Sequence, residues 1–404
     1  MPIPAGIAHL VTARRTPFGA VHGLLSGWHP VDLLAHTMRV TLDDAGVSAE
    51  DVSTVLVGCA HPVGAQSFNI GRAAVLTAGW PDRIPATTVE RGSGSSQRAL
   101  HFAAHAIRAG ALDLAVVAGV EVMSLVPAGA PALNRQYGPI WGQGPADRYA
   151  NAGGLIPAGV AGDRLASRNG IDRAMQDDEA ARSRDRASST EHPPWLVVTP
   201  TRLNDRDQPR AALTVMLDDE APGAEPAADC APLHDDGGTV AATNIAPPAD
   251  GASVAVLAST RWVTEQRRSA PMVIVGCAEG AVDPVTMFGA GPAAARGALD
   301  QAGLVVTDLV AVELDAPHAA AALQLRTDLG VDPAIVNRTG GGLGRGRPLG
   351  AVGVGMMAEV VGLMTHRHEE TGPVLMVDEN DDGTATATVL APDDSPTPTT
   401  SLTS

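Results

Sequence analysis

The chain of 404 residues contains no lysine, only three cysteines and only 3% aromatic residues. Without lysine, neither a Schiff-base lysine nor the lysine of a phosphate-binding P-loop can be present. Cys59, Cys230 and Cys277 lie far apart and form no CxxC pair, so no disulfide framework and no metal site are predicted. Because aromatic residues are so few, the hydrophobic core must consist mainly of alanine, valine and leucine.

An excess of positive charge is also missing, because the formal net charge is −17. Nucleic-acid binding needs a basic surface, and we expect neither a nucleic-acid partner nor an anionic membrane partner. No apolar run approaches 18 residues, so no transmembrane helix is expected. The N-terminus lacks a charged start followed by an apolar segment, and a cytoplasmic location is predicted.

Helix and strand signals alternate in the first 120 residues. Apolar residues recur at helical spacing in 29–46 and 95–110, and both segments end at a glycine. Short apolar runs with β-branched residues occupy 52–60 and 112–121 and predict buried strands. This alternation is typical of a layered α/β fold.

The middle of the chain is different in composition. Residues 122–245 are rich in Gly, Pro, Asp and Arg, and only 160–187 has helical periodicity. The acidic stretch 218–236 has little apolar content and is predicted not to fold. The α/β alternation returns from about residue 250. The predicted division is an N-terminal half (1–121), an inserted loop domain (122–245), a C-terminal half (246–391) and a disordered tail (392–404).

An internal repeat connects the two halves. The segment "LDDAGVSAEDVSTVLVG" (42–58) aligns without gaps to "LDQAGLVVTDLVAVELD" (299–315). Both contain a helix end, an Ala-Gly pair, an aspartate and then a buried strand. The match predicts two copies of one structural unit.

Several segments, in the same order, resemble the thiolase superfamily and its acetyl-CoA acetyltransferases. They are "VTARRTPFG", "VERGSGSSQRALHFAAHAIRAGALDLAVVAGVEVMSLVP", "DRAMQDDEAARSRDRA", "GTVAATNIAPPADGASVAVLAS" and "VNRTGGGLGRGRPLGAVGVG". The resemblance implies a five-layered αβαβα fold of two similar halves with an inserted loop domain. It also implies an acyl-CoA or acyl-carrier thioester as ligand, no other cofactor, and a homodimer or a heteromer with another thiolase-fold protein.

The resemblance locates four catalytic loops, and each carries an unexpected residue. Ser93 takes the place of the nucleophilic cysteine. Asp315 and Ala316 replace the asparagine and glutamate of an Asn-Glu-Ala-Phe motif, and Arg347 replaces the histidine of a Gly-His-Pro motif. The second cysteine falls at Val377 or close to it. We expect Arg347 to pair with Asp315, with binding of a carboxylate or phosphate as the alternative.

These replacements disfavour ordinary thiolase chemistry. A serine hydroxyl needs a positioned base, and an arginine cannot accept a proton. The sequence therefore predicts a noncatalytic or partner subunit, with an emptied active site, that binds acyl-CoA or an acyl carrier. The alternative is a divergent acyltransferase in which Ser93 accepts the acyl group and His318 or an acidic residue of 378–382 acts as the base.

The glycine-rich segment "GGGLGRG" does not predict a dinucleotide site. It does not follow a strand within a βαβ unit, and no acidic residue lies about twenty positions further on. By the resemblance, Gly341, Gly342 and Gly346 are expected to line an acyl-CoA pocket together with Ala246.

Overall fold

The structure is a computed structural model, and the descriptions below cover residues 6–133, 138–152, 154–190, 193–205, 208–209, 214–220, 230–234, 237–366 and 371–393. The main strands join in one sheet path, in the order β12-β13-β14-β11-β1-β10-β5-β3-β4. Their bounds are β1 Ala8–Arg15, β3 Thr54–Gly58, β4 Ala86–Val89, β5 Leu114–Val122, β10 Ala249–Ser259, β11 Met272–Ala281, β12 Ala311–Asp315, β13 Val374–Glu379 and β14 Thr384–Pro392.

The longer helices are α1 Pro30–Ala45, α2 Ile70–Thr77, α3 Ser95–Arg108, α6 Ala158–Asn169, α7 Arg173–Ser188, α9 Gly291–Ala302, α10 Ala319–Leu329 and α12 Val352–His366. Shorter elements include α4 Ala130–Leu133, α5 Gln143–Arg148, α8 Thr260–Glu265, α11 Gly342–Arg345, β2 Gly19–Ala20, β6 Thr199–Pro200, β7 Asn204–Asp205, β8 Gln208–Pro209 and β9 Val215–Met216. No helix in the described part of the chain is long and apolar enough to cross a membrane.

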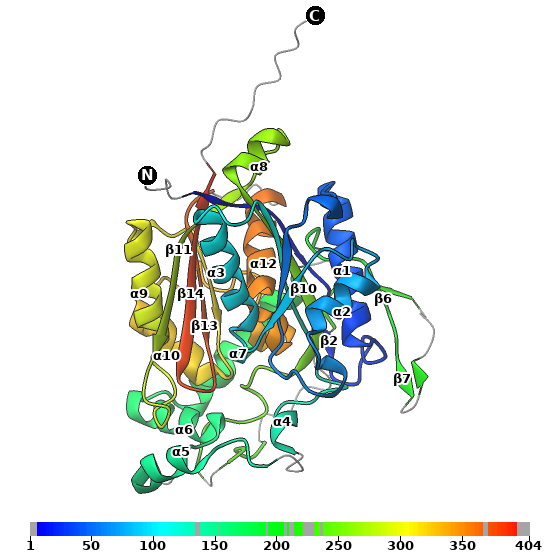
Figure 1. The fold of residues 1–404 in the computed structure, drawn as a ribbon. Helices are drawn as coiled ribbons and strands as arrows, with labels where there is room; N and C mark the ends of the chain where they lie inside the picture. The colour runs from blue at the N-terminus through cyan, green and yellow to red at the C-terminus, as the bar shows by residue number, and fades with distance from the viewer. Residues whose placement is uncertain are drawn as a thin grey trace, which may run out of the picture.

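The sheet path consists of two halves that meet at β1. β1 pairs with β10 along its length but with β11 only over Ala8–Leu10. The middle helices α3 and α12 pack between the two half-sheets in one buried apolar cluster. α1 and α2 cover the outer face of the first half-sheet, and α9 and α10 cover that of the second (Figure 1). The predicted five-layered α/β/α/β/α arrangement is confirmed.

The internal repeat is visible in the backbone. Gly46 ends α1 with φ of 61°, and Gly303 ends α9 with φ of 68°. Both angles lie in the left-handed region, which glycine adopts without a steric cost. β3 and β12 then begin at the same distance from their glycines. Because Gly58 and Asp315 are equivalent positions in the repeat, Asp315 ends its strand where the first copy has only a glycine.

The inserted region contains α6 and α7, separated by a turn at Gly170 with φ of 66°. This helix pair was predicted. The division after residue 245 stays a prediction; β10 begins at Ala249 and lies between β1 and β5. The tail 394–404 lies outside the described residues, as does most of the acidic stretch.

The start of that acidic stretch is an exception to its predicted lack of structure. Asp219 accepts a hydrogen bond from the backbone N–H of Phe18, and Glu220 accepts hydrogen bonds from those of Ala20 and Leu24. Composition predicted a linker, but these two carboxylates satisfy backbone donors before, within and after β2, and donors removed from water require partners.

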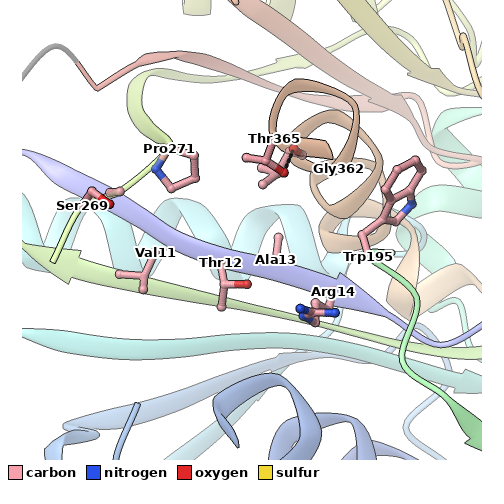
Figure 2. Close-up of a pocket in the computed structure, with 11 residues that line it drawn as sticks. Val11, Thr12, Ala13, Arg14, Trp195, Ser269, Pro271, Gly362 and Thr365 are labelled. Atoms are coloured by element: carbon pink, nitrogen blue, oxygen red, sulfur yellow. Dashed lines mark hydrogen bonds between the residues drawn. The ribbon is translucent and has the colours of Figure 1, made fainter. Parts of the chain in front are cut away.

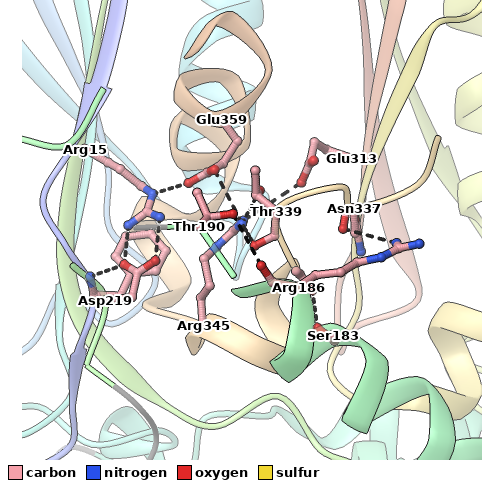
Figure 3. A network of polar contacts seen from close by, with 12 residues as sticks. Arg15, Ser183, Arg186, Thr190, Asp219, Glu313, Asn337, Thr339, Arg345 and Glu359 are labelled. Atoms are coloured by element: carbon pink, nitrogen blue, oxygen red, sulfur yellow. Dashed lines mark hydrogen bonds and ion pairs between the residues drawn. The ribbon is translucent and has the colours of Figure 1, made fainter. Parts of the chain in front are cut away.

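A buried ionic network connects the layers (Figure 3). Arg15, at the end of β1, donates from Nε to Glu359 of α12 at 2.5 Å and holds both carboxylate oxygens of Asp219. Arg345 lies 3.4 Å from Glu359 and 4.0 Å from Glu313 of β12. Burial raises the pKa of Glu313 to about 8, against the opposing effect of Arg345. The network thus joins both half-sheets through the middle helix layer.

Replacement of Glu359 by alanine is expected to lower the free energy of unfolding by about 3–5 kcal/mol, because it leaves buried guanidinium groups without their shared carboxylate. Urea denaturation followed by circular dichroism measures the change. Glu50→Ala is the control, since Glu50 pairs with Arg83 on the surface, and its loss is expected to stay within about 0.5 kcal/mol. Similar losses for the two variants would contradict the interpretation.

Candidate active site

Two parallel strands bring two carboxyl groups together. β12 and β13 are neighbours, and their register sets Asp315 opposite Asp378. Both residues lie at the carboxyl ends of their strands, where α/β sheets form ligand sites. Asp315 is 3% exposed and Asp378 is fully buried. A pair of buried acids at one sheet edge is therefore built into the strand register.

Ser93 approaches this edge from the other half of the molecule. It lies in the loop between β4 and α3, directly before Gly94, the N-cap residue of α3. The side-chain oxygen of Asn380, just after β13, accepts a hydrogen bond from the Gly94 backbone N–H at 2.8 Å. A Cβ atom at Gly94 would lie 3.0 Å from the Asn380 amide nitrogen. A side chain at position 94 would therefore force Asn380 to shift away from the loop.

Arg347 completes the cluster from the glycine-rich segment after α11. Its backbone N–H donates to the carbonyl of Pro247 at 2.8 Å, which fixes the start of the side chain. Its Nε donates to Asp315 at 2.6 Å, and its Nη2 donates to the Ser93 hydroxyl oxygen at 2.7 Å. The predicted contact between Arg347 and Asp315 is present in the structure.

The Ser93 hydroxyl group has two acceptors within reach. Its Oγ lies 2.9 Å from Asp378 Oδ1 and 2.8 Å from Asn380 Oδ1. A hydroxyl carries one proton, so it donates to only one of them at a time. An ionised Asp378 attracts that proton, and Arg347 meanwhile donates to the same oxygen. This arrangement presents a serine with a carboxylate acceptor on one side and a cationic donor on the other.

Burial and charge act together on the acid pair. Burial raises the pKa of Asp378 well above its usual range, and the neighbouring negative charge of Asp315 raises it further, while Arg347 opposes both effects. Two close carboxyl groups cannot both ionise easily. A raised pKa makes the Asp378 carboxylate a stronger base than an ordinary aspartate.

Asp378 belongs to the fourth catalytic loop and to the acidic residues 378–382 that were considered for a base. The second cysteine was expected to fall at Val377 or close to it, and Val377 itself, which has no titratable group, is fully buried in the core of the second half-sheet. Successive side chains of a strand point to opposite faces, so the next residue faces Ser93. The acidic run "VDENDDG" was the available signal, but its register relative to Ser93 could not be read from the letters.

His318 occupies a different position from the one considered for a base. It is the N-cap of α10, and its Nδ1 accepts a hydrogen bond from the Ala321 backbone N–H at 3.1 Å. Burial lowers its pKa to about 4. Its ring contacts Phe288 edge-on with centroids 4.8 Å apart, and it makes no hydrogen bond to Ser93. Among the described residues, Asp378 is the carboxyl group in hydrogen-bond contact with the serine.

Two cavities meet at Arg347. One, here the serine pocket, has a volume of about 280 Å³ and is lined by Ser93 and His61 among others. The second, here the histidine pocket, has a volume of about 260 Å³ and is lined by His318 and Ala246 among others. Arg347, Leu349 and Asp381 line both cavities.

Of the four residues expected to line an acyl-CoA pocket, Ala246 lines the histidine pocket. The three glycines line neither of these two cavities and pack against neighbouring side chains instead. A Cβ atom at Gly341, Gly342 or Gly346 would come within 3 Å of Asn337, Asp315 and Ala249, respectively. These close approaches show that the glycine-rich segment is packed so tightly that side chains at the three positions would not fit.

A cavity of about 520 Å³ lies at the far end of α12, away from the cluster (Figure 2). Thr365 lines it, and at about 1.5 Å per residue Thr365 is about 20 Å from the start of α12 near Ser93. Its other lining residues include Trp195 and Arg14, and none of them belongs to the Ser93 cluster. It is therefore a separate cavity.

Neither buried cysteine substitutes for the missing nucleophile, and Cys230 contacts Arg173 of α7 instead of the Ser93 cluster. Cys59 and Cys277 are buried, and none of the three cysteines forms a disulfide. Burial raises the pKa of the Cys277 thiol to about 11, and that of Cys59 is raised as well. Thiols with raised pKa values stay protonated and unreactive at neutral pH. The hydroxyl of Ser93 is the nucleophile that the cluster contains.

Comparison with known proteins now assigns the family. A family model described as "Thiolase, N-terminal domain" matches residues 8–261, and one described as "Thiolase, C-terminal domain" matches residues 269–391. The chain belongs to the thiolase family. The steroid 3-ketoacyl-CoA thiolase FadA6 of Mycobacterium tuberculosis is 30% identical over 95% of this chain and 93% of its own length.

Other thiolases agree with this assignment. A 3-ketoacyl-CoA thiolase of Bacillus subtilis is 32% identical, covering 91% of this chain and 95% of its own. The crystal structure of the Bacillus anthracis acetyl-CoA acetyltransferase superposes with a TM-score of 0.83 at 26% identity, over 96% of this chain and 99% of that chain. The human mitochondrial 3-ketoacyl-CoA thiolase has the same fold, with a TM-score of 0.81 at 24% identity over 96% of this chain and 100% of its own.

These relatives contradict the prediction of a noncatalytic or partner subunit. They are named as thiolases, which are enzymes, and they match this thiolase-family chain over nearly its whole length. The prediction interpreted the changes in the four catalytic loops as a concerted loss of catalysis. In the structure, each of the four loops contributes one residue to a hydrogen-bonded chain: Asp378, Ser93, Arg347 and Asp315. The site is therefore occupied by a connected polar cluster.

Replacement of His318 by alanine is expected to lower the free energy of unfolding by about 1 kcal/mol, because α10 loses its N-cap acceptor. His318→Asn is the matched variant, since asparagine caps helices well and is expected to recover most of the loss. Thermal unfolding of the two variants checks this. Equal losses for both would show that the ring contributes through packing against Phe288 instead.

Proposed function

We propose that the protein is an acyl-CoA-dependent acyltransferase that cleaves 3-ketoacyl-CoA thioesters with Ser93 as the acyl acceptor. The observation that supports this best is the Ser93 hydroxyl, 2.9 Å from Asp378 and 2.7 Å from Arg347, at the strand ends of a thiolase fold. The substrate class rests on the relatives, which are named as 3-ketoacyl-CoA thiolases. Coenzyme A is a substrate in this proposal, and no further cofactor is invoked.

In the first half of the reaction, Ser93 Oγ attacks the C3 carbonyl carbon of the substrate. The hydroxyl proton passes to Asp378, the O–C3 bond forms and the C2–C3 bond breaks. The departing acetyl-CoA carbanion takes up that proton at C2, and an acyl ester remains on Ser93. Asp378 thus acts as base and then as acid, which suits a carboxyl group with a raised pKa.

In the second half, the thiol of coenzyme A gives its proton to Asp378 and its sulfur attacks the ester carbonyl. The bond to Ser93 breaks, and the serine oxygen recovers the proton. Arg347 holds the serine oxygen through Nη2, and Asp315 holds Arg347 in place through Nε. An oxygen ester is less reactive toward a thiol than a thioester, so this half is expected to be the slower one.

Slow release predicts that the acyl ester accumulates. Incubation with acetoacetyl-CoA, without added coenzyme A, is expected to increase the intact mass of the protein by one acetyl group, and Ser93→Ala is expected to lose this adduct. Ser93→Cys is the matched variant, because it keeps the nucleophile position while the ester becomes a thioester. It is expected to turn over faster. The proposal is refuted if the adduct persists in Ser93→Ala. It is also refuted if neither the wild type nor Ser93→Cys forms the adduct.

The proposed role of Asp378 predicts a pH dependence. Only the ionised carboxylate accepts the serine proton, so the acylation rate of the wild type is expected to rise with pH through the raised pKa of Asp378. Asp378→Asn is expected to slow acylation by about 10²–10⁴-fold and to abolish this rise. Rates from rapid-mixing mass spectrometry over a pH series check this. An unchanged pH profile in the variant would exclude Asp378 as the base.

The association of the chain with further copies and its cytoplasmic location remain predictions. A homodimer, or a heteromer with another thiolase-fold protein, follows from the family resemblance alone. The acyl-carrier alternative for the thioester likewise has no separate support in the described residues.

A further inference from the structure

The wall between the two pockets contains a half-exposed acid. Arg347, Leu349 and Asp381 are shared by the serine pocket and the histidine pocket. Arg347 is 4% exposed and fixed by its hydrogen bonds, whereas the Asp381 side chain is 50% exposed. Asp381 lies in the turn between β13 and β14 and makes no hydrogen bond to the residues that the structure describes. Of the two charged residues in the wall, Asp381 is therefore the less restrained.

Of the three guanidinium nitrogens of Arg347, two donate hydrogen bonds to described residues and one does not. Nε is engaged by Asp315, and Nη2 is engaged by Ser93 and, at 3.3 Å, by the carbonyl of Glu379. Nη1 makes no hydrogen bond within the described part of the chain. The carboxylate oxygen recorded near it belongs to Asp381, at 3.8 Å, which is too long for a hydrogen bond. A buried cation thus keeps a donor group available at the wall between the pockets.

The nucleophile and the predicted acyl-CoA residue Ala246 lie on opposite sides of this wall. The nucleophile faces the serine pocket, while Ala246 and His318 face the histidine pocket. Because Arg347, Leu349 and Asp381 line both cavities, a ligand that extends from one cavity into the other passes these three residues. The reacting carbonyl group would then lie beside Ser93 and Arg347, and its oxygen becomes negative as the serine attacks. A negative Asp381 near the same nitrogen opposes that charge.

We propose that Asp381 is a gate between the two pockets, and that its displacement frees Arg347 Nη1 to bind the reacting carbonyl oxygen of the substrate. This inference rests on the proposed function, because it takes an acyl-CoA as the ligand. Asp381 is a positioning residue here: it acts through Arg347 and does not touch the reacting atoms. No bond is made or broken by the gate itself.

The test compares two ligands in two variants of the otherwise unaltered chain. The first ligand is an unreactive acetyl-CoA analogue in which a methylene group replaces the thioester sulfur, and the second is coenzyme A itself, which has no acyl carbonyl. Asp381→Asn is expected to bind the analogue about five- to tenfold more tightly than the wild type does, with little change for coenzyme A. Isothermal titration calorimetry measures both affinities.

Asp382→Asn is the matched control. It removes the same charge from the same turn, but Asp382 lines neither pocket, and an asparagine still offers the oxygen that accepts from the Thr384 backbone N–H at 3.0 Å. This variant is expected to leave the ratio of the two affinities unchanged. An equal increase for both variants, or an equal increase for both ligands, would overturn the gate and indicate a general effect of charge.

These measurements are independent of acyl-enzyme formation, because the analogue cannot lose its leaving group. If the gate proposal is wrong, Asp381→Asn leaves the ratio of the analogue and coenzyme A affinities unchanged. If the proposed function is wrong, no acyl adduct forms on Ser93. If neither the analogue nor coenzyme A binds to any of the chains, the gate proposal is overturned as well. Circular dichroism of Asp381→Asn verifies that the turn substitution leaves the fold intact.

Discussion

The buried guanidinium group of Arg347 is the constraint on which the candidate site depends. A cation removed from water is tolerated only with good partners. Asp315 satisfies Nε and the Ser93 hydroxyl satisfies Nη2, so the group connects a strand end of one half with the nucleophile loop of the other. Burial lowers the pKa of Arg347, but the surrounding aspartates raise it by more, and the group stays charged. The remaining features of the site follow from this fixed positive charge.

The fold supplies the neighbours that such a charge needs. Parallel pairing of β12 and β13 brings Asp315 and Asp378 to one edge, and the loop before α3 delivers Ser93 to the same place. A second buried cation, Arg15, likewise donates hydrogen bonds to the carboxylates of Asp219 and Glu359. Both networks use arginine, whose planar group donates to several partners at once. A chain without lysine is well suited to this solution.

Much of the architecture could be predicted from local patterns. Apolar periodicity located the helices α1 and α3 and the strands β3 and β5 to within a few residues, because burial imposes that spacing on each segment separately. The repeat predicted that Gly46 and Gly303 end equivalent helices, and both have left-handed φ values. Ser93, Asp315 and Arg347 were identified as site positions from the family resemblance. The contact between Arg347 and Asp315 was also predicted. The noncatalytic role was predicted incorrectly, because substitutions read along the sequence do not reveal that Ser93 meets both Arg347 and Asp378.

By itself, the sequence determined the layered fold, the duplicated halves and the family, since these depend on burial patterns and motifs that are continuous along the chain. Only the tertiary structure decided that Asp378, and not Val377, faces Ser93, because a strand turns alternate side chains to opposite faces and one residue of register changes the chemistry. It also decided that Asn380 supports the nucleophile loop and that Asp381 stands between two pockets. The contacts of Ser93 with Asp378 and Asn380 join residues almost 290 positions apart. Local sequence patterns do not indicate which residues so far apart in the chain come into contact.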